Sequence, residues 1–212
     1  MMKAFIINRD RLTLPKKMYE WLIPFDVEPV IIDNASTYKP LLDWYDSGVN
    51  VIRLNRNVGY KCFWEESLFK TIPYNEPYIL TDSDLDLSGI PDNWMQVLKI
   101  GLLDYSVDKV GFSLEVNDLP INPYTDMIRK WESKYWDFKE GNYYRAYIDT
   151  TFAMYRGGIH WHTYKAFRTE RPFTAKHVPW YYQSFQKMPD DERYYFEHSE
   201  TSLGKYFKTG NV

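Results

Sequence analysis

Three aspartates at alternate positions follow an apolar segment that is typical of a buried strand. The segment reads YILTDSDLDL (78–87), and the acids are Asp82, Asp84 and Asp86. Unpaired carboxylates inside a sheet carry a large desolvation cost, so we expect all three where the chain leaves the strand. Hard oxygen ligands this close together suit Mg²⁺ or Mn²⁺ bound to a diphosphate, although a solvated acidic turn has the same spacing.

The elements that would position these acids alternate along the first half of the chain. Apolar segments predict strands and the segments between them predict helices: strands at 3–8, 29–33, 50–54, 78–81 and 109–116, and helices at about 13–23, 38–46, 60–71 and from Pro91 onward. Thr13 is expected to cap the first helix. Strands that are apolar nearly throughout predict an α/β fold with a mostly parallel central sheet flanked by helices. Ligands bind such a sheet at the carboxyl ends of its strands.

Polar residues follow each of the first four predicted strands. In chain order they are Asn8, Arg9 and Asp10; Asp33 and Asn34; Arg56, Asn57 and Gly59; and Asp82 with Ser83. At a ligand-binding edge a carboxylate can accept from a pyrimidine imide, an arginine can pair with phosphate, and a glycine lets the backbone approach a ligand. Each residue taken singly is an ordinary turn or helix-capping residue, so their joint occurrence is what favours a nucleotide site.

The order of these motifs resembles the nucleotide-sugar half of GT-A fold glycosyltransferases, particularly the inverting enzymes of family 2. The motifs are NRD after the first strand, then VIIDNAS, LNRNVGY and YILTDSD. The later segments YIDTTFAMYR and RPFTAKHVPWY resemble a subgroup of bacterial and viral proteins that includes domains encoded by large algal (chlorella) viruses. The resemblance spans about residues 3–182.

The resemblance implies a GT-A (nucleotide-diphospho-sugar transferase) fold and a metal-dependent, inverting glycosyltransferase of the hexosyltransferase type. Such an enzyme moves a sugar from a nucleotide-diphosphate donor, with a UDP-sugar favoured, to a glycan or other hydroxyl acceptor. Asp33 would lie against the nucleotide base and Asp82 against the ribose. Asp84, with Asp82 or Asp86 beside it, would hold Mn²⁺ or Mg²⁺.

Residues from the C-terminal half would complete the site. His177 resembles a histidine that reaches the metal or the diphosphate, and Arg171 is a candidate phosphate partner. An inverting enzyme also needs a base that deprotonates the acceptor, and the glutamate and aspartate pair that often serves in family 2 is not evident. Asp149 is the first candidate, because it is the one acid in the apolar segment 144–156, which predicts a further strand. Glu115 is the second, and either acid could instead be structural.

Two other features of the second half have more than one interpretation. His160 and His162 form an HxH pair without a third ligand at the usual spacing, so we interpret them as loop residues rather than as a zinc site. A group of aromatic residues could line an acceptor cleft or fill the core: Tyr124, Trp131, Tyr135, Trp136, Phe138, Tyr143 and Tyr144.

Composition limits the class of protein. At 212 residues, 44% of them hydrophobic, the chain can form a single domain with a sizeable core. We expect a nucleotide half at about 1–116 and an acceptor half at about 117–212, with an irregular tail from residue 157. The whole could be one domain of a longer polypeptide. A net charge of −3 without a basic stripe argues against nucleic acid as a partner.

The expected location is the cytoplasm, or the host cytoplasm if the protein is viral. Cys62 is the only cysteine, and the start MMKAFIINRDR is charged too early for a signal peptide, so we expect a protein that is not secreted. Because no apolar run approaches the roughly 20 residues of a membrane helix, we expect no membrane span. The sequence does not indicate an oligomeric state.

Two other classes of function share the same features. A sugar-phosphate nucleotidyltransferase has a similar architecture and metal requirement, but it usually has a glycine-rich phosphate loop where this chain has Asn8-Arg9-Asp10-Arg11. A non-catalytic module for nucleotide sugars or glycans would keep the pocket without the base. It would bind its ligand without turnover.

Overall fold

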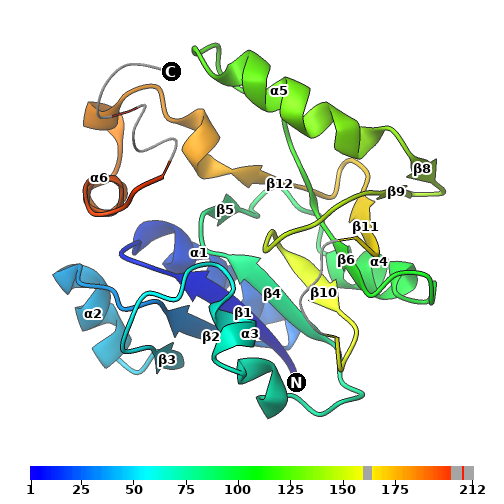
Figure 1. Ribbon diagram of the computed structural model, residues 1–212, viewed down its shortest axis with the longest axis horizontal. Coiled ribbons are helices and arrows are strands. Elements are labelled where there is room, and N and C mark those ends of the chain that lie inside the picture. Colours follow the sequence, from blue (N-terminus) through cyan, green and yellow to red (C-terminus); the bar gives the residue numbers. More distant parts are fainter. Residues whose placement is uncertain (160–163, 202–206, 208–212) are drawn as a thin grey trace.

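The computed structural model describes residues 1–159, 164–201 and 207. Within these residues the central element is a nine-stranded sheet in the order β3-β2-β1-β4-β10-β6-β11-β9-β8 (Figure 1). Its strands are β1 (Met2–Asn8), β2 (Val27–Asp33), β3 (Val51–Arg53), β4 (Tyr78–Asp82), β6 (Lys109–Gly111), β8 (Lys139–Glu140), β9 (Tyr143–Arg145), β10 (Ala153–Tyr155) and β11 (Ala166–Thr169). β9 and β10 run antiparallel to their neighbours, and the other strands share one direction. The predicted mostly parallel α/β sheet is therefore confirmed.

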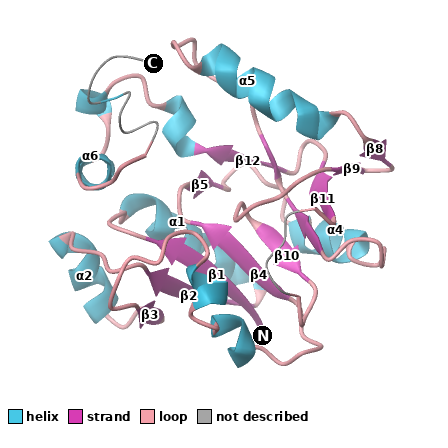
Figure 2. Ribbon diagram, viewed as in Figure 1, coloured by secondary structure: helices cyan, strands magenta, loops and turns pink. Residues whose placement is uncertain are grey.

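Helices cover both faces of the sheet, as the alternation of buried residues in β1 requires (Figure 2). Ala4 and Ile6 pack in one apolar cluster with residues of α1 (Thr13–Leu22), α2 (Lys39–Asp46) and α4 (Trp94–Gly101). Phe5 and Ile7 pack in a second cluster with α3 (Cys62–Glu65). Successive side chains of a strand point to opposite faces, so β1 supports both layers at once.

Three predicted elements differ from the structure. The predicted helix at 60–71 is broken, because Ser67 adopts a left-handed conformation with a φ of 58° and only a 3₁₀ turn follows it. The predicted strand at 109–116 divides between β6 and β7 (Ser113–Leu114), which belongs to a small second sheet with β5 (Leu85–Asp86) and β12 (Thr174–His177). The predicted strand at 144–156 is two strands, β9 and β10, joined by a bend.

The prediction of an irregular tail from residue 157 was wrong for its described part. β11 joins the central sheet, β12 joins the small sheet, and α6 (Asp190–Glu197) closes over the start of α1. The two strands have four residues each, which is too short to show a clear period.

α6 also supplies the cap of α1, in place of the predicted Thr13. Oδ2 of Asp191 accepts from the backbone N–H groups of Leu12 and Thr13 at 2.8 and 2.6 Å, and Thr13 is the first residue of the helix. A carboxylate at this end satisfies N–H groups that have no partner within the helix and interacts favourably with the helix dipole. α6 is thereby fastened to the start of α1.

The aromatic segment divides between core and surface. Tyr124 and Tyr135, just before and just after α5 (Thr125–Ser133), are buried, whereas Trp131 and Phe138 are exposed. None of the helices in the described ranges has the length and apolar character needed to cross a membrane.

Candidate active site

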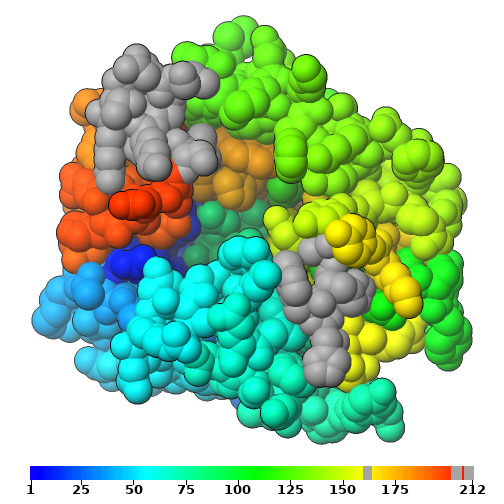
Figure 3. All heavy atoms as spheres, viewed as in Figure 1, coloured from blue at the N-terminus to red at the C-terminus, as the bar shows by residue number. Residues whose placement is uncertain are grey.

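A cleft of about 670 Å³ opens at the carboxyl ends of β1 and β4. Figure 3 shows the surface hollowed between the blue and cyan N-terminal part of the chain, the red α6 and the green middle part. The cleft is lined by Ile7, Asn8, Arg9, Arg11, Asn34, Asn57, Gly59, Tyr60, Asp82, Ser83, Asp84, Tyr195, His198, Ser199, Glu200 and Thr201. Its position and its size are those of a small-molecule site in an open α/β sheet.

Asp82 ends β4 and is hydrogen-bonded to Thr150, which precedes β10. Its backbone N–H donates to the carbonyl oxygen of Thr150 at 2.9 Å, and the Thr150 hydroxyl donates to its Oδ2 at 2.8 Å. Burial, together with the negative charges of Asp84 and Asp149, raises the pKa of Asp82 well above its ordinary value. Several acids therefore converge at the end of this strand.

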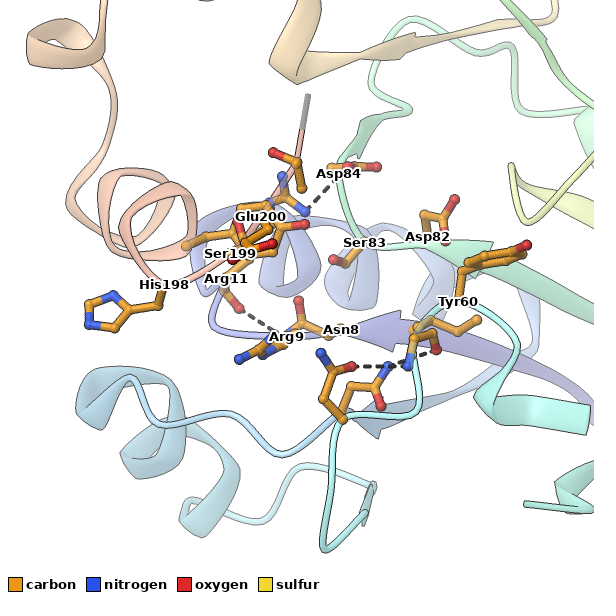
Figure 4. A pocket seen from close by; sticks show the side chains of 16 residues that line it. Asn8, Arg9, Arg11, Tyr60, Asp82, Ser83, Asp84, His198, Ser199 and Glu200 are labelled. Carbon is orange, nitrogen blue, oxygen red and sulfur yellow. Dashed lines mark hydrogen bonds and ion pairs between the residues drawn. The ribbon is translucent and has the colours of Figure 1, made fainter. Parts of the chain in front are cut away.

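Asp84 lies on the turn that follows β4, and Figure 4 shows its ion pair with Arg11. Its Oδ2 is 3.3 Å from Nη1 of Arg11 and 3.4 Å from Nε2 of His177. Burial alone would raise the pKa of Asp84, but the His177 imidazole and the Arg11 guanidinium hold it below its ordinary value. Asp84 is thus kept as a carboxylate inside the cleft.

Arg11 is the buried cation at the centre of the site. Its Nε lies 2.8 Å from Oε1 of Glu192 on α6, and its guanidinium carbon lies 3.6 Å from the ring centre of Tyr195. The side chain is only 8% exposed, and the pKa of Arg11 is raised by Glu192 and Asp84 despite its burial. Arg11 and Glu192 were not predicted as site residues. One feature of the sequence could have indicated Arg11: it is the second arginine in the polar stretch that follows β1.

The residues around Asp84 fit a divalent cation that is completed by a substrate. Among the described residues, the buried Oδ1 of Asp84 has no hydrogen-bond partner, and no cluster of three or more His, Cys, Asp or Glu residues could hold a metal alone. Mg²⁺ is usually bound by one or two carboxylates together with substrate phosphates. Asp84 and His177 would supply the protein ligands, with the Asp82 carboxyl beside them.

Asn8 lines the cleft, whereas the predicted Asp33 does not. Asp33 is 3% exposed and is held by the Ser36 N–H at 3.2 Å and the Tyr45 hydroxyl at 3.4 Å. Asn8 donates through Nδ2 to the Arg11 carbonyl and to the Tyr45 hydroxyl. Its buried Oδ1 has no partner among the described residues. Asp33 therefore acts on the cleft through Tyr45 and Asn8.

The other predicted residues at this edge shape the loops around the cleft. The Asp10 carboxylate accepts from the backbone of Thr37 and Tyr38, and the Asn34 side chain bonds with the backbone of Val58 and Gly59. Their geometry is that of loop-fastening residues.

The arginines of these loops differ from one another. Arg9 and Asn57 line the cleft, and the side chain of Asn57 also accepts from the N–H of Gly59, whose φ of 80° favours glycine. Arg56 is exposed and pairs with Glu66 at 3.0 Å, so it is not brought to the cleft.

Asp86, Glu115 and Arg171 also lie outside the cleft. Asp86 is exposed on β5 and accepts from the Ser88 N–H. Glu115 makes a two-fold hydrogen-bonded pair with Arg171, at 2.8 and 2.9 Å. Two backbone N–H groups also donate to Glu115. The Glu115 carboxylate is therefore already engaged by Arg171 and the backbone, and the Arg171 guanidinium is occupied by Glu115.

Asp149 lies in an exposed bend between β9 and β10, and not inside a strand as predicted. It lines a second cavity of about 330 Å³ together with Tyr60, Asp82, Tyr147 and Thr150. Its Oδ1 accepts from the backbone N–H and the hydroxyl of the residue two positions later, at 3.1 and 2.8 Å. Because Asp82 and Tyr60 line both cavities, the second cavity adjoins the first. His160 and His162 lie outside the described residues.

Comparisons with known proteins bear on the fold. No family model matches the sequence and no curated protein matches it. The structure is similar to that of the mannosyltransferase PcManGT from Pyrobaculum calidifontis in complex with GDP-Man and Mn²⁺, with a TM-score of 0.52 and 13% identity over 99% of this chain and 79% of that chain. It is also similar to TarS 1-349 from S. aureus, with a TM-score of 0.40 and 16% identity over 74% of this chain and 47% of that chain. The first similarity confirms the predicted GT-A fold class.

Proposed function

We propose that the protein is a metal-dependent glycosyltransferase that uses a nucleotide-diphosphate sugar as donor. The observation that supports this most is Asp84, which lines the cleft at the carboxyl ends of β1 and β4 with a side chain that is 14% exposed, and whose Oδ2 lies close to both Arg11 and His177. In the GT-A fold such a carboxylate lies where a donor diphosphate and its cation would bind. A divalent cation bound there would act as a Lewis acid on the leaving phosphate.

The nucleotide would bind along the edge formed by β1 and the loop before α3. Asn8 Oδ1 would accept from an imide N–H of the base, which would satisfy a buried oxygen that has no protein partner among the described residues. Arg9, which lines the cleft with a side chain that is 30% exposed, would approach the diphosphate. Uracil presents such an imide donor, so we propose a UDP-sugar as donor; thymine presents the same imide, and the nucleotide panel below separates the two.

The acceptor hydroxyl would enter through the second cavity, where Asp149 faces the same space as Asp82. Asp149 would take the proton of the attacking hydroxyl as general base. One displacement of this kind inverts the anomeric centre. Glu115 would have to leave Arg171 before it could act, so Asp149 is the base that the geometry favours.

A thermal-shift panel tests the donor site. UDP or a UDP-sugar at 100 times its dissociation constant should stabilise the fold by about 2.7 kcal/mol, because it binds only the folded protein. Mn²⁺ should strengthen that binding. GDP and dTDP and their sugars are the matched controls for the base. If no nucleotide shifts the melting temperature in the presence of Mn²⁺, the proposed donor site is wrong. If GDP alone shifts it, the donor base is guanine and not uracil.

A further inference from the structure

A segment without regular secondary structure, 147–150, carries Asp149 and is bonded at every one of its carbonyl oxygens. We call it the anchored segment. The first carbonyl accepts from Nε of Arg168 at 2.8 Å, and the second accepts from Nζ of Lys109 at 2.6 Å. The third accepts from Lys109 at 3.3 Å and from the Tyr155 hydroxyl at 3.2 Å. The fourth accepts from the backbone N–H of Asp82.

Lys109 is a completely buried lysine, which is rare in proteins. It is the first residue of β6 and pairs in register with Tyr155 on β10, whose hydroxyl lies 3.2 Å from its Nζ. Burial lowers the pKa of Lys109 to about 7. An apolar residue at this position would avoid the cost of burying an amine. We therefore attribute the presence of a lysine here to its hydrogen bonds with the carbonyl groups of the anchored segment.

Arg168 reaches the same segment from the acceptor half. It lies on β11 with a buried side chain, and its Nη1 lies 2.9 Å from Oε2 of Glu132 on α5. Its guanidinium carbon lies 4.1 Å from the ring centre of Tyr135. Glu132 and the Tyr135 ring therefore fix the guanidinium group of Arg168, while its Nε donates to the backbone of the anchored segment.

The opposite end of the anchored segment is joined to the donor site. Thr150 and Asp82 bond reciprocally, backbone to backbone and side chain to side chain. A shift of the segment would therefore change the placement of Asp149 relative to Asp82. Misplacement of a reacting group by about 1 Å can cost about 10²-fold in rate.

We propose that Lys109 and Arg168 are positioning residues, which hold the anchored segment so that Asp149 faces the acceptor hydroxyl beside Asp82. This proposal rests on the proposed function, with Asp149 as the base. Neither residue is among those that line the cleft or the second cavity. Their effect is on the geometry of the base and not on donor binding.

Lys109→Met tests the proposal, because methionine keeps most of the length of lysine and removes its donors. We expect kcat to fall by about 10²-fold while the dissociation constant of UDP, measured by calorimetry, stays within a few-fold. In the double variant with Asp149→Asn, kcat should be no lower than in Asp149→Asn alone, because both changes remove the same contribution. A merely structural lysine would instead add its own loss to the double variant.

Val110→Ala is the matched control, since Val110 is the next residue of β6 and is also buried. It should lower the free energy of unfolding and leave kcat within about two-fold of the wild-type value. Arg168→Lys is the alternative test variant if Lys109→Met does not fold. Lysine keeps the positive charge opposite Glu132, but it cannot make the hydrogen bond that Nε of Arg168 donates to the anchored segment. Full kcat in either folded variant would overturn the positioning role. If the wild-type protein turns over no donor, or Asp149→Asn keeps full kcat, the proposed function has failed instead.

Discussion

Asp84→Asn is expected to abolish turnover while the protein stays folded. The substitution keeps the size of the side chain and removes the charge that would hold the cation next to the leaving phosphate. Loss of this stabilisation should lower kcat by about 10³-fold or more, equivalent to roughly 4 kcal/mol of transition-state stabilisation. Arg11 would keep its bond to Glu192, so the network around it survives. Steady-state kinetics and circular dichroism measure the two effects.

Asp86→Asn is the matched control for this variant. Asp86 belongs to the same acidic stretch, but it is exposed on β5 and lies outside the cleft. We expect its kcat to stay within about two-fold of the wild-type value, as for surface substitutions away from the site. Near wild-type turnover of Asp84→Asn at limiting Mn²⁺ would show that Asp84 does not hold the metal.

Asp149→Asn should lower kcat by about 10² to 10⁴-fold, the usual contribution of a general base. The asparagine can keep the hydrogen bonds to Thr151 through its oxygen, so the bend should be preserved. The dissociation constant of the donor nucleotide should change by no more than a few-fold, because Asp149 lines the second cavity and not the donor cleft. Single-turnover kinetics and calorimetry separate these quantities.

Glu115→Gln is the comparison for Asp149, because it neutralises the other candidate acid. Glu115 is held by Arg171 and by backbone N–H groups, so its substitution should lower stability more than kcat. A variant of Asp149 that loses nucleotide binding together with turnover would make Asp149 a structural residue. A large fall of kcat in Glu115→Gln alone would transfer the role of base to Glu115.

The strands and the edge of the sheet were predictable because their signals are local. β1, β2 and β4 are apolar nearly throughout and end in polar residues, and α1 and α2 lie close to their predicted bounds. The cleft does lie at the carboxyl ends of these strands, with Asp82 and Asp84 in it. The period and the length of the apolar segments are therefore enough to predict these strands and the edge of the sheet where the cleft lies.

Contacts between distant parts of the chain were not predictable. The Arg11 and Glu192 pair joins residues 181 positions apart, and the Asp191 cap of α1 comes from the same distant helix. The end of the cleft where we propose that the base binds also depends on contacts that the sequence does not reveal. Asp33 occupies the predicted end of β2, but only the packing of Tyr45 and Asn8 decides which oxygen reaches the cleft.

Nuclear magnetic resonance of a reaction mixture tests the central proposal most directly. The mixture contains the protein, Mn²⁺, a UDP-sugar and a sugar acceptor, with the Asp84→Asn variant as the background. We expect release of UDP and a new glycosidic anomeric signal of the configuration opposite to that of the donor. A product of retained configuration would contradict the single displacement. Absence of transfer above the variant's background with UDP-, GDP- and dTDP-sugars alike would contradict the assignment as a glycosyltransferase.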